Sequence, residues 1–129
     1  MKIDSTDRDS LDLDRAWVEI DRAALTHNIR GLQGLLGPHT ALMAVVKANA
    51  YGHGAVGVAQ VAQDLGVQCF GVATLQEGIE LRQGGITRPI VLLGAAQSEA
   101  QIQAIAQWQL QPTLCTPEQA QRFSERLLA

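Results

Sequence analysis

Leu42-Met43-Ala44-Val45-Val46-Lys47-Ala48-Asn49-Ala50-Tyr51-Gly52-His53-Gly54 joins an apolar run to a polar segment that contains glycine. The run begins one residue earlier, and residues 41–46 carry no charge or amide, which is typical of a strand buried on both faces of a parallel sheet. The polar segment predicts a turn, and its first residue is a lysine. We therefore expect a strand that ends at a loop, with one amine at its carboxyl end.

The same alternation continues along the chain. Short apolar runs and segments of helical periodicity follow one another at a spacing of about 20 to 30 residues, which is the rhythm of a parallel α/β sheet. The residues alone leave two architectures open, a βα barrel and an open doubly wound sheet. The pattern gives little support for a dinucleotide-binding fold, because no Gly-x-Gly-x-x-Gly follows a strand. The expected strands are residues 41–46, 69–73, 90–93 and 112–115.

Capping signals place the helices between these strands. Thr74 with Glu77 forms a capping-box pattern, Ser98 can open the next helix, and Thr116 with Gln119 repeats the capping-box pattern around a proline. Three of the expected helices cover about residues 24–36, 55–65 and 74–83. Two more are expected to begin at residues 98 and 117.

The segment before the first of these helices also has a pattern. Residues 17–20 alternate as a half-buried strand would, and Asp21 can cap the helix that follows. In that helix Leu25, Ile29 and Leu32 recur at helical spacing, which predicts one apolar face.

Composition and charge exclude several classes of protein. An apolar content of 47% with 18% charged residues is globular rather than disordered. A net charge of −3 with scattered basic residues gives no reason to expect a nucleic-acid partner. No apolar run approaches the ~20 residues of a membrane span, and residues 1–14 are too rich in Asp, Ser and Arg for a secretory signal. We expect residues 1–14 to be a mobile leader, residues 15–129 to be the folded part, and the protein to be cytoplasmic.

Two cysteines are too few for a disulfide framework, and their spacing does not suit zinc. Cys69 and Cys115 lie in short apolar stretches, so we expect small buried thiols in strands and no metal site.

Lys47 is the residue from which chemistry can be argued. In βα barrels the active site is built at the carboxyl ends of the strands. Partial burial there favours the neutral amine, which can attack an aldehyde and form a Schiff base. On position alone, an ordinary strand-end lysine that reaches solvent is the better explanation of Lys47, and position alone identifies no cofactor.

The context of Lys47 is more specific than its position. Residues 45–54 are very similar to the cofactor-lysine signature of alanine racemases, and three further segments agree in order and approximate spacing. These are Trp17-Val18-Glu19-Ile20-Asp21 with His27-Asn28, Val72-Ala73-Thr74-Leu75-Gln76-Glu77-Gly78 with Glu80-Leu81-Arg82, and Gly85-Ile86 with Pro89-Ile90-Val91-Leu92-Leu93-Gly94. The resemblance is strongest over residues 17–94 and weaker towards residue 129.

The resemblance implies a fold, a cofactor and site residues. The family has an N-terminal (β/α)8 TIM barrel that holds pyridoxal 5'-phosphate, a C-terminal β domain, and a homodimer with active sites at the subunit interface. Lys47 matches the lysine that binds the cofactor as a Schiff base and then acts as a base on one face of the substrate. Tyr51 matches the tyrosine whose hydroxyl contacts the cofactor phosphate, and Val45 and Leu93 match positions that line the cofactor pocket. His53 is expected only to order the loop by a hydrogen bond.

The implied reaction is the interconversion of L-alanine and D-alanine, which supplies D-alanine for cell-wall synthesis. A tyrosine from the partner subunit's C-terminal domain serves the second face, and 129 residues do not reach that domain. A complete barrel needs ~250 residues, so we expect a partial barrel with about half of its strand–helix units, belonging to a truncated chain that is inactive alone.

Two other hypotheses about this chain remain. One is a pyridoxal-phosphate-binding barrel module without racemase activity, whose known examples lack Tyr51-Gly52-His53-Gly54 after the lysine. Amino-acid decarboxylases of the same fold type are disfavoured for a similar reason. The other is a truncated product that does not fold stably.

Overall fold

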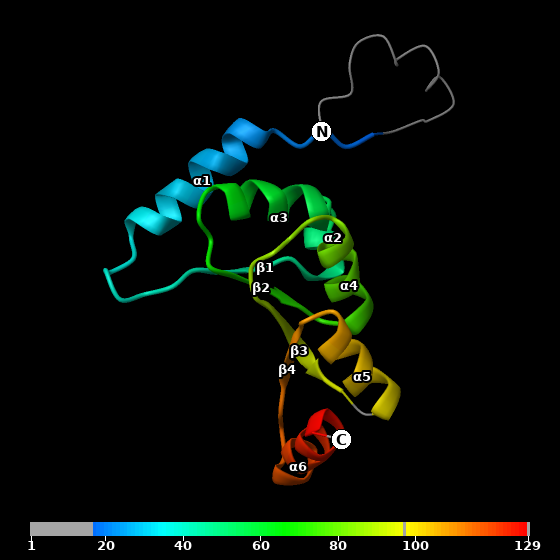
Figure 1. The fold of residues 1–129 in the computed structure, drawn as a ribbon. Coiled ribbons are helices and arrows are strands. Elements are labelled where there is room, and N and C mark those ends of the chain that lie inside the picture. The colour runs from blue at the N-terminus through cyan, green and yellow to red at the C-terminus, as the bar shows by residue number, and fades with distance from the viewer. Residues whose placement is uncertain (1–16, 97, 129) are drawn as a thin grey trace.

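The fold was determined as a computed structural model that describes residues 17–96 and 98–128 (Figure 1). Helices and strands alternate over most of this range. The elements are α1 (Arg22–Gly34), β1 (Met43–Val45), α2 (Lys47–Tyr51), α3 (Ala55–Asp64), β2 (Cys69–Val72), α4 (Leu75–Gln83), β3 (Ile90–Ala95), α5 (Glu99–Gln107), β4 (Gln111–Thr113) and α6 (Pro117–Leu128).

The four strands form one parallel sheet in the order β1-β2-β3-β4, which is also their order in the chain. Each neighbouring pair is joined by a crossover that contains a helix: α3, α4 and α5 in turn. Parallel strands added one by one in sequence order, each followed by a helix, are the arrangement of a (β/α)8 barrel, and four strands make half of one. The predicted α/β class and the partial barrel are confirmed.

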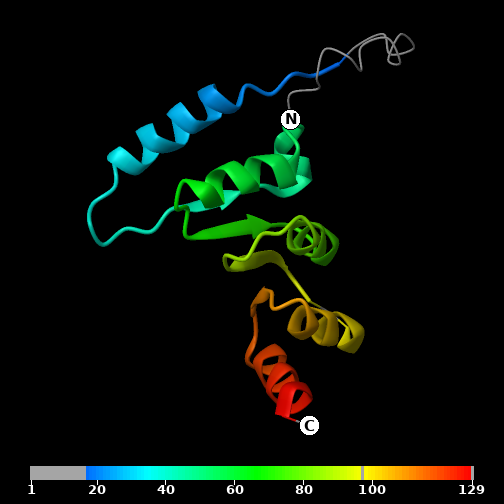
Figure 2. The ribbon, with the colours of Figure 1, turned by 45° about the horizontal axis from the view of Figure 1, so that its top comes forward.

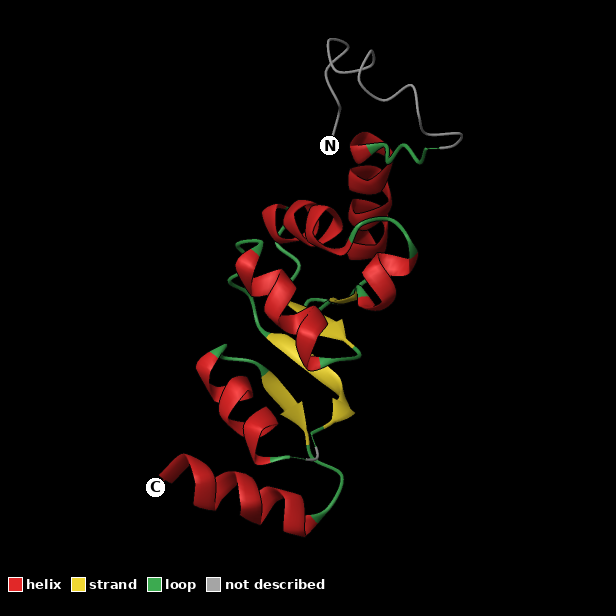
Figure 3. Cartoon of the chain, turned by 90° about the vertical axis from the view of Figure 1, so that its right-hand side faces the viewer, coloured by secondary structure: helices red, strands yellow, loops and turns green. Residues whose placement is uncertain are grey.

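The sheet has one covered face and one open face. Phe70, Val72, Ile90 and Leu92 are fully or almost fully buried beneath the helices, and α4 contacts both β2 and β3. Figures 1 and 3 show the crossover helices gathered on one side of the strands. On the opposite face, apolar side chains of β1 and β3 stay partly exposed: Met43, Val45 and Leu93. That face corresponds to the inside of a barrel.

Most helix starts obey the capping rules. The Asp21 carboxylate accepts hydrogen bonds from the amides of Ala23 (2.7 Å) and Ala24 (3.1 Å), and capping boxes begin α4 at Thr74 and α5 at Ser98. These predictions are confirmed. Before α6 the box is altered, because the side chain of Gln119 accepts from the amide of Cys115 rather than from that of Thr116.

Two predictions, one about residues 17–20 and one about the cysteines, were wrong. Residues 17–20 form no strand, and Trp17 and Val18 are 74% and 77% exposed, because no strand in the described part of the chain pairs with them. Cys115 follows β4 and is exposed, and Cys69 in β2 is only half-buried, so neither is a fully buried thiol. Burial nevertheless raises the pKa of the Cys69 thiol. The predicted leader, residues 1–14, lies outside the described residues.

Helix α1 lies away from the sheet, and its main contacts are made with α3 (Figure 2). Of its expected apolar face, Ile29 is buried and Leu25 is half-buried, whereas Leu32 is 54% exposed. None of the helices in the described ranges is long and apolar enough to cross a membrane.

The carboxyl end of β3 is irregular. Leu92 pairs with Pro112, but the next pair joins Ala95 to Thr113, so β3 carries extra residues at Leu93 and Gly94. The hydroxyl of Thr113 donates to the carbonyl oxygen of Leu92 at 2.6 Å and stabilises this irregularity. Such bulges redirect the strand and are common beside functional sites.

Candidate functional site

Lys47 lies two residues after the last residue of β1 and is half-buried. Val46 stands between them, and its amide still donates to the carbonyl oxygen of Gly71 in β2 at 2.9 Å. Because all four strands are parallel, their carboxyl ends lie at one edge of the sheet. The structure therefore places Lys47 at the edge where barrels build their active sites, as the sequence predicts.

The sequence predicted only a turn after Lys47, but the backbone there is a short left-handed helix. It makes up residues 48–51 of α2, and we call it the left-handed turn. Ala48, Asn49, Ala50 and Tyr51 have φ values of 50°, 53°, 51° and 54°. For residues with a Cβ this conformation costs ~1–2 kcal/mol each, so four in a row are rare. Strain of this kind persists only where surrounding contacts impose it, and it gathers at functional sites.

Hydrogen bonds from both sides hold the left-handed turn. The Ala50 amide donates to the Val46 carbonyl at 2.9 Å, and the Asn49 carbonyl accepts from the Gly54 amide at 2.9 Å. The Asn49 side chain also accepts from the amide of Ala55, the first residue of α3, at 2.8 Å. The turn is thus fastened to β1 at its start and to α3 at its end.

The predicted pocket residues Val45 and Leu93 meet on the open face of the sheet around Gly71. A Cβ built on Gly71 would lie 3.3 Å from Cγ2 of Val45 and 3.5 Å from Cδ1 of Leu93. The two side chains therefore close over the backbone of Gly71, one strand away from Lys47. Together they form an apolar, partly exposed surface near the carboxyl edge of the sheet.

Tyr51 and His53 differ in how firmly they are held. The Tyr51 side chain is 63% exposed at the end of the left-handed turn. The His53 ring nitrogen Nδ1 lies 3.1 Å from the carbonyl oxygen of Ala50 and donates to it, since a carbonyl can only accept. The predicted loop-ordering role of His53 is confirmed.

The sequence predicted Glu77 only as part of a capping box and not as a residue of the site. Its carboxylate accepts from the amides of Ala73 (2.7 Å) and Thr74 (3.1 Å), and also from Ala48 (2.8 Å). Burial alone would raise the pKa of Glu77, but these three donors and the positive charge of Lys47 together hold it below its usual value. No local signal reveals the bond to Ala48, since it spans 29 positions.

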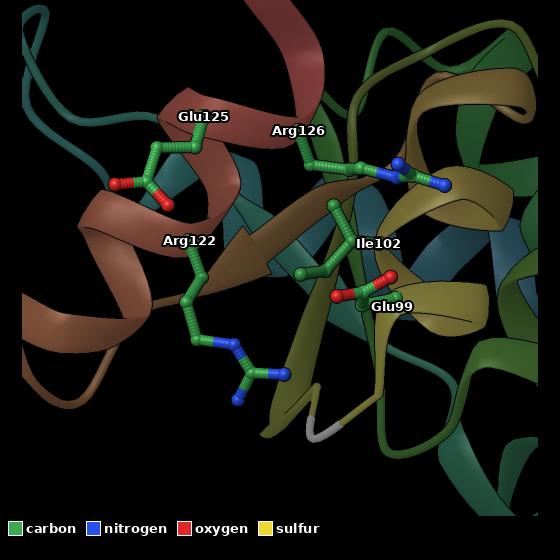
Figure 4. A pocket seen from close by; sticks show the side chains of 5 residues that line it. All are labelled: Glu99, Ile102, Arg122, Glu125 and Arg126. Carbon is green, nitrogen blue, oxygen red and sulfur yellow. The ribbon is translucent and has the colours of Figure 1, made fainter. Parts of the chain in front are cut away.

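Two of the surface hollows in the described part of the chain differ in position and lining. One, of about 180 Å³, lies at the carboxyl edge of β2 and β3 and is lined by residues that include Ala73, Thr74 and Gly94. The other, of about 210 Å³, lies between α5 and α6 and is lined by charged side chains and Ile102 (Figure 4). Neither hollow is lined by Lys47, Tyr51, Val45 or Leu93. Only the first hollow lies at the carboxyl edge, where Lys47 follows β1, so this edge is the candidate site. No cluster of three or more potential metal-ligating side chains occurs among the described residues.

A family model for the N-terminal domain of alanine racemase matches residues 20–129. The chain belongs to the alanine racemase family. It is 63% identical over 114 residues to the alanine racemase of Synechocystis sp., a match that covers 88% of this chain and 31% of that protein. It is 61% identical over 113 residues to the alanine racemase of Nostoc sp., covering 88% of this chain and 29% of that protein.

Solved alanine racemases agree in fold. The alanine racemase of Clostridium difficile, solved in complex with cycloserine, superposes with a TM-score of 0.81 at 37% identity, covering 85% of this chain and 29% of that chain. The resemblance predicted from residues 17–94 is therefore confirmed and extends to the last residue of the chain. The chain spans less than a third of the length of these racemases and corresponds to their N-terminal region.

Proposed function

We propose that this chain forms the cofactor-binding part of an alanine racemase and that Lys47 bonds covalently to pyridoxal 5'-phosphate. The observation that carries the proposal is the position of Lys47 at the carboxyl edge, between the apolar face of the sheet and a strained left-handed turn. Membership of the alanine racemase family supplies the reaction class.

The residues present fit the cofactor. Lys47 offers the amine that an aldehyde needs, and Val45 and Leu93 with Gly71 between them offer an apolar surface for a ring. Tyr51 offers an exposed hydroxyl at the same edge that can donate to a phosphate oxygen. When bound, the cofactor would act as an electron sink that stabilises negative charge at the substrate Cα.

The protein's own part in the reaction is to hold and move a proton. We propose that the Lys47 amine removes or returns the Cα proton on one face of alanine. A tyrosine hydroxyl of a C-terminal domain in a partner subunit would serve the other face, since racemisation needs a base on each side. On this proposal the working enzyme is a cytoplasmic homodimer that makes D-alanine for the cell wall, and the 129 residues alone lack the second base.

Mapping of the cofactor bond tests the assignment of Lys47. The chain has two lysines, Lys2 and Lys47, so borohydride reduction after incubation with pyridoxal 5'-phosphate gives a simple peptide map. We expect label on Lys47, none after Lys47→Ala, and an unchanged yield after Lys2→Ala. Label on Lys2 alone would reject the assignment.

Turnover separates a racemase part from a self-sufficient enzyme. We expect the 129-residue chain to form the reducible adduct but to release no D-alanine from L-alanine. Rapid D-alanine formation by this chain would contradict the need for a second base from another domain. A longer chain that carries the C-terminal domain should racemise alanine, whereas a binding module would hold the cofactor and racemise nothing.

A further inference from the structure

The carboxylate of Glu77 links two βα units of the sheet. Its Oε2 atom accepts from the amides of Ala73 and Thr74, where β2 passes into α4. Its Oε1 atom accepts from the amide of Ala48, directly after Lys47 at the end of β1, at 2.8 Å. One side chain therefore joins the start of α4 to the peptide bond between Lys47 and Ala48.

Helix capping explains only part of this arrangement. A capping box consists of two hydrogen bonds. The Thr74 hydroxyl oxygen accepts from the backbone amide of Glu77, at 3.2 Å here, and the Glu77 carboxylate accepts from the backbone amide of Thr74. The bond to Ala48 adds nothing to the capping of α4. It is instead a charge-assisted bond to the first residue of the left-handed turn, and such bonds are about twice as strong as neutral ones.

Lys47 also interacts with Glu77 through its charge. The positive charge of Lys47, after the three backbone donors, also lowers the pKa of the Glu77 carboxyl. The carboxylate therefore bonds the peptide that follows Lys47 and interacts with the charge of its amine.

We propose that Glu77 is a positioning residue for Lys47, holding the Lys47–Ala48 peptide and the amine at the carboxyl edge where pyridoxal 5'-phosphate would bind. The inference rests on the proposed function for the identity of the ligand, but the coupling of Glu77 to Lys47 does not. Without Glu77 the turn loses its bond to the neighbouring unit, and the peptide that follows Lys47 is no longer held from that side.

A cofactor-free measurement tests the coupling. Reductive ¹³C-methylation labels the amines of Lys2 and Lys47 and keeps their charge. We expect the Lys47 methyl resonance to shift with pH as Glu77 titrates below its ordinary value of 4.5, and this inflection to vanish in Glu77→Gln. Glu80→Gln is the matched control, because Glu80 lies on the same helix and bonds to Gln76. An inflection that survives Glu77→Gln, or that Glu80→Gln abolishes, would overturn the proposal.

Amide hydrogen exchange at neutral pH gives a second test that acid unfolding does not affect. In Glu77→Gln a single amide oxygen cannot replace both carboxylate oxygens, so exchange of the Ala48 amide should speed up about tenfold. Thr74→Ala weakens the cap of α4 as well but leaves the bond to Ala48, so its Ala48 amide should stay protected. Equal exchange in the two variants would mean that Glu77 is only a cap and would overturn the proposal.

The reducible adduct with pyridoxal 5'-phosphate separates this inference from the proposed function. We expect Glu77→Gln to weaken adduct formation at Lys47 about tenfold, and Thr74→Ala and Glu80→Gln to leave it within about twofold. If the unsubstituted chain forms the adduct and Glu77→Gln forms it equally well, the positioning role is wrong and the proposed function stands. If the unsubstituted chain forms none while the resonance and exchange results hold, the proposed function fails and the coupling of Glu77 to Lys47 stands.

Discussion

A Cβ added to Gly94 would lie 2.6 Å from the carbonyl oxygen of Ala73, so β3 approaches the end of β2 by its backbone alone. The contact lies at the carboxyl edge of the sheet, within the irregular part of β3. Since a backbone oxygen cannot move aside without parting the two strands, we expect Gly94→Ala to lower the free energy of unfolding by about 1–3 kcal/mol. Urea denaturation of the purified variant measures this loss.

Gly71→Ala is the matched control in the same sheet. There the nearest atoms are side-chain ends, Sδ of Met43 and Cγ2 of Val45, both at 3.3 Å, and side chains can shift by a few tenths of an ångström. We expect a change within about 1 kcal/mol. Equal losses in Gly71→Ala and Gly94→Ala would show that the backbone contact at Ala73 is not what makes Gly94 necessary.

In the left-handed turn we expect a substitution by glycine to stabilise the fold, whereas glycine usually destabilises a helix. Ala48 is exposed and has φ 50°, so its methyl group gains little from burial and adds backbone strain. We expect Ala48→Gly to raise the free energy of unfolding by up to about 1 kcal/mol, because relief of strain exceeds the added entropy of the unfolded chain. Thermal or urea denaturation gives the sign directly.

The same substitution in an ordinary helix should have the opposite sign. Ala120 is exposed in α6, and Ala120→Gly should cost about 1 kcal/mol. If both variants are destabilised alike, the turn after Lys47 is not strained in solution.

Local signals account for most of the fold that could be predicted. The apolar runs at residues 41–46, 69–73 and 90–93 became the three N-terminal strands of the sheet. The prediction that residues 41–46 are buried on both faces was wrong, because helices cover one face and leave Met43 and Val45 partly exposed on the other. The capping box at Thr74 fixed the start of α4 for an equally local reason. Lys47 was placed correctly because strand order and parallel direction together define one edge.

Long-range contacts account for what could not be predicted. Alanine and tyrosine do not favour positive φ, and asparagine adopts it as a single residue only. The left-handed turn after Lys47 therefore depends on bonds to its flanking segments and to Glu77. The bond between Glu77 and Ala48 joins units that only the fold brings together. Residues 17–20 failed as a strand for the converse reason, since a correct alternation of side chains needs a partner strand to pair with.

Arg82 ties α4 to the turn that follows α5. Its guanidinium donates to the carbonyl oxygens of Trp108 (3.0 Å) and Gln109 (2.8 Å), and to those of Ile86 and Arg88 (both 2.7 Å). Lysine cannot reproduce this fork of donors. We expect Arg82→Lys to lower the free energy of unfolding by about 1–3 kcal/mol, measured by urea denaturation.

An exposed arginine provides the comparison for Arg82. Arg30 lies on the surface of α1, and Arg30→Lys should change the free energy of unfolding by less than about 0.5 kcal/mol. A comparable loss at Arg30 and Arg82 would mean that the four carbonyl contacts contribute little.

The lowered pKa of Glu77 predicts how stability changes in acid. A carboxyl whose pKa is lower in the folded than in the unfolded state contributes stability that is complete above its ordinary value, 4.5 here, and is lost as pH falls through the lowered value. Glu77→Gln should therefore be less stable than the unsubstituted chain at neutral pH, and the difference should narrow as pH falls below 4.5. Urea denaturation at a series of pH values follows this narrowing. Thr113→Val removes an uncharged hydrogen bond to Leu92, so its deficit should stay constant over the same range. A Glu77→Gln deficit that is equally constant would show that the charge of this carboxylate does not stabilise the fold.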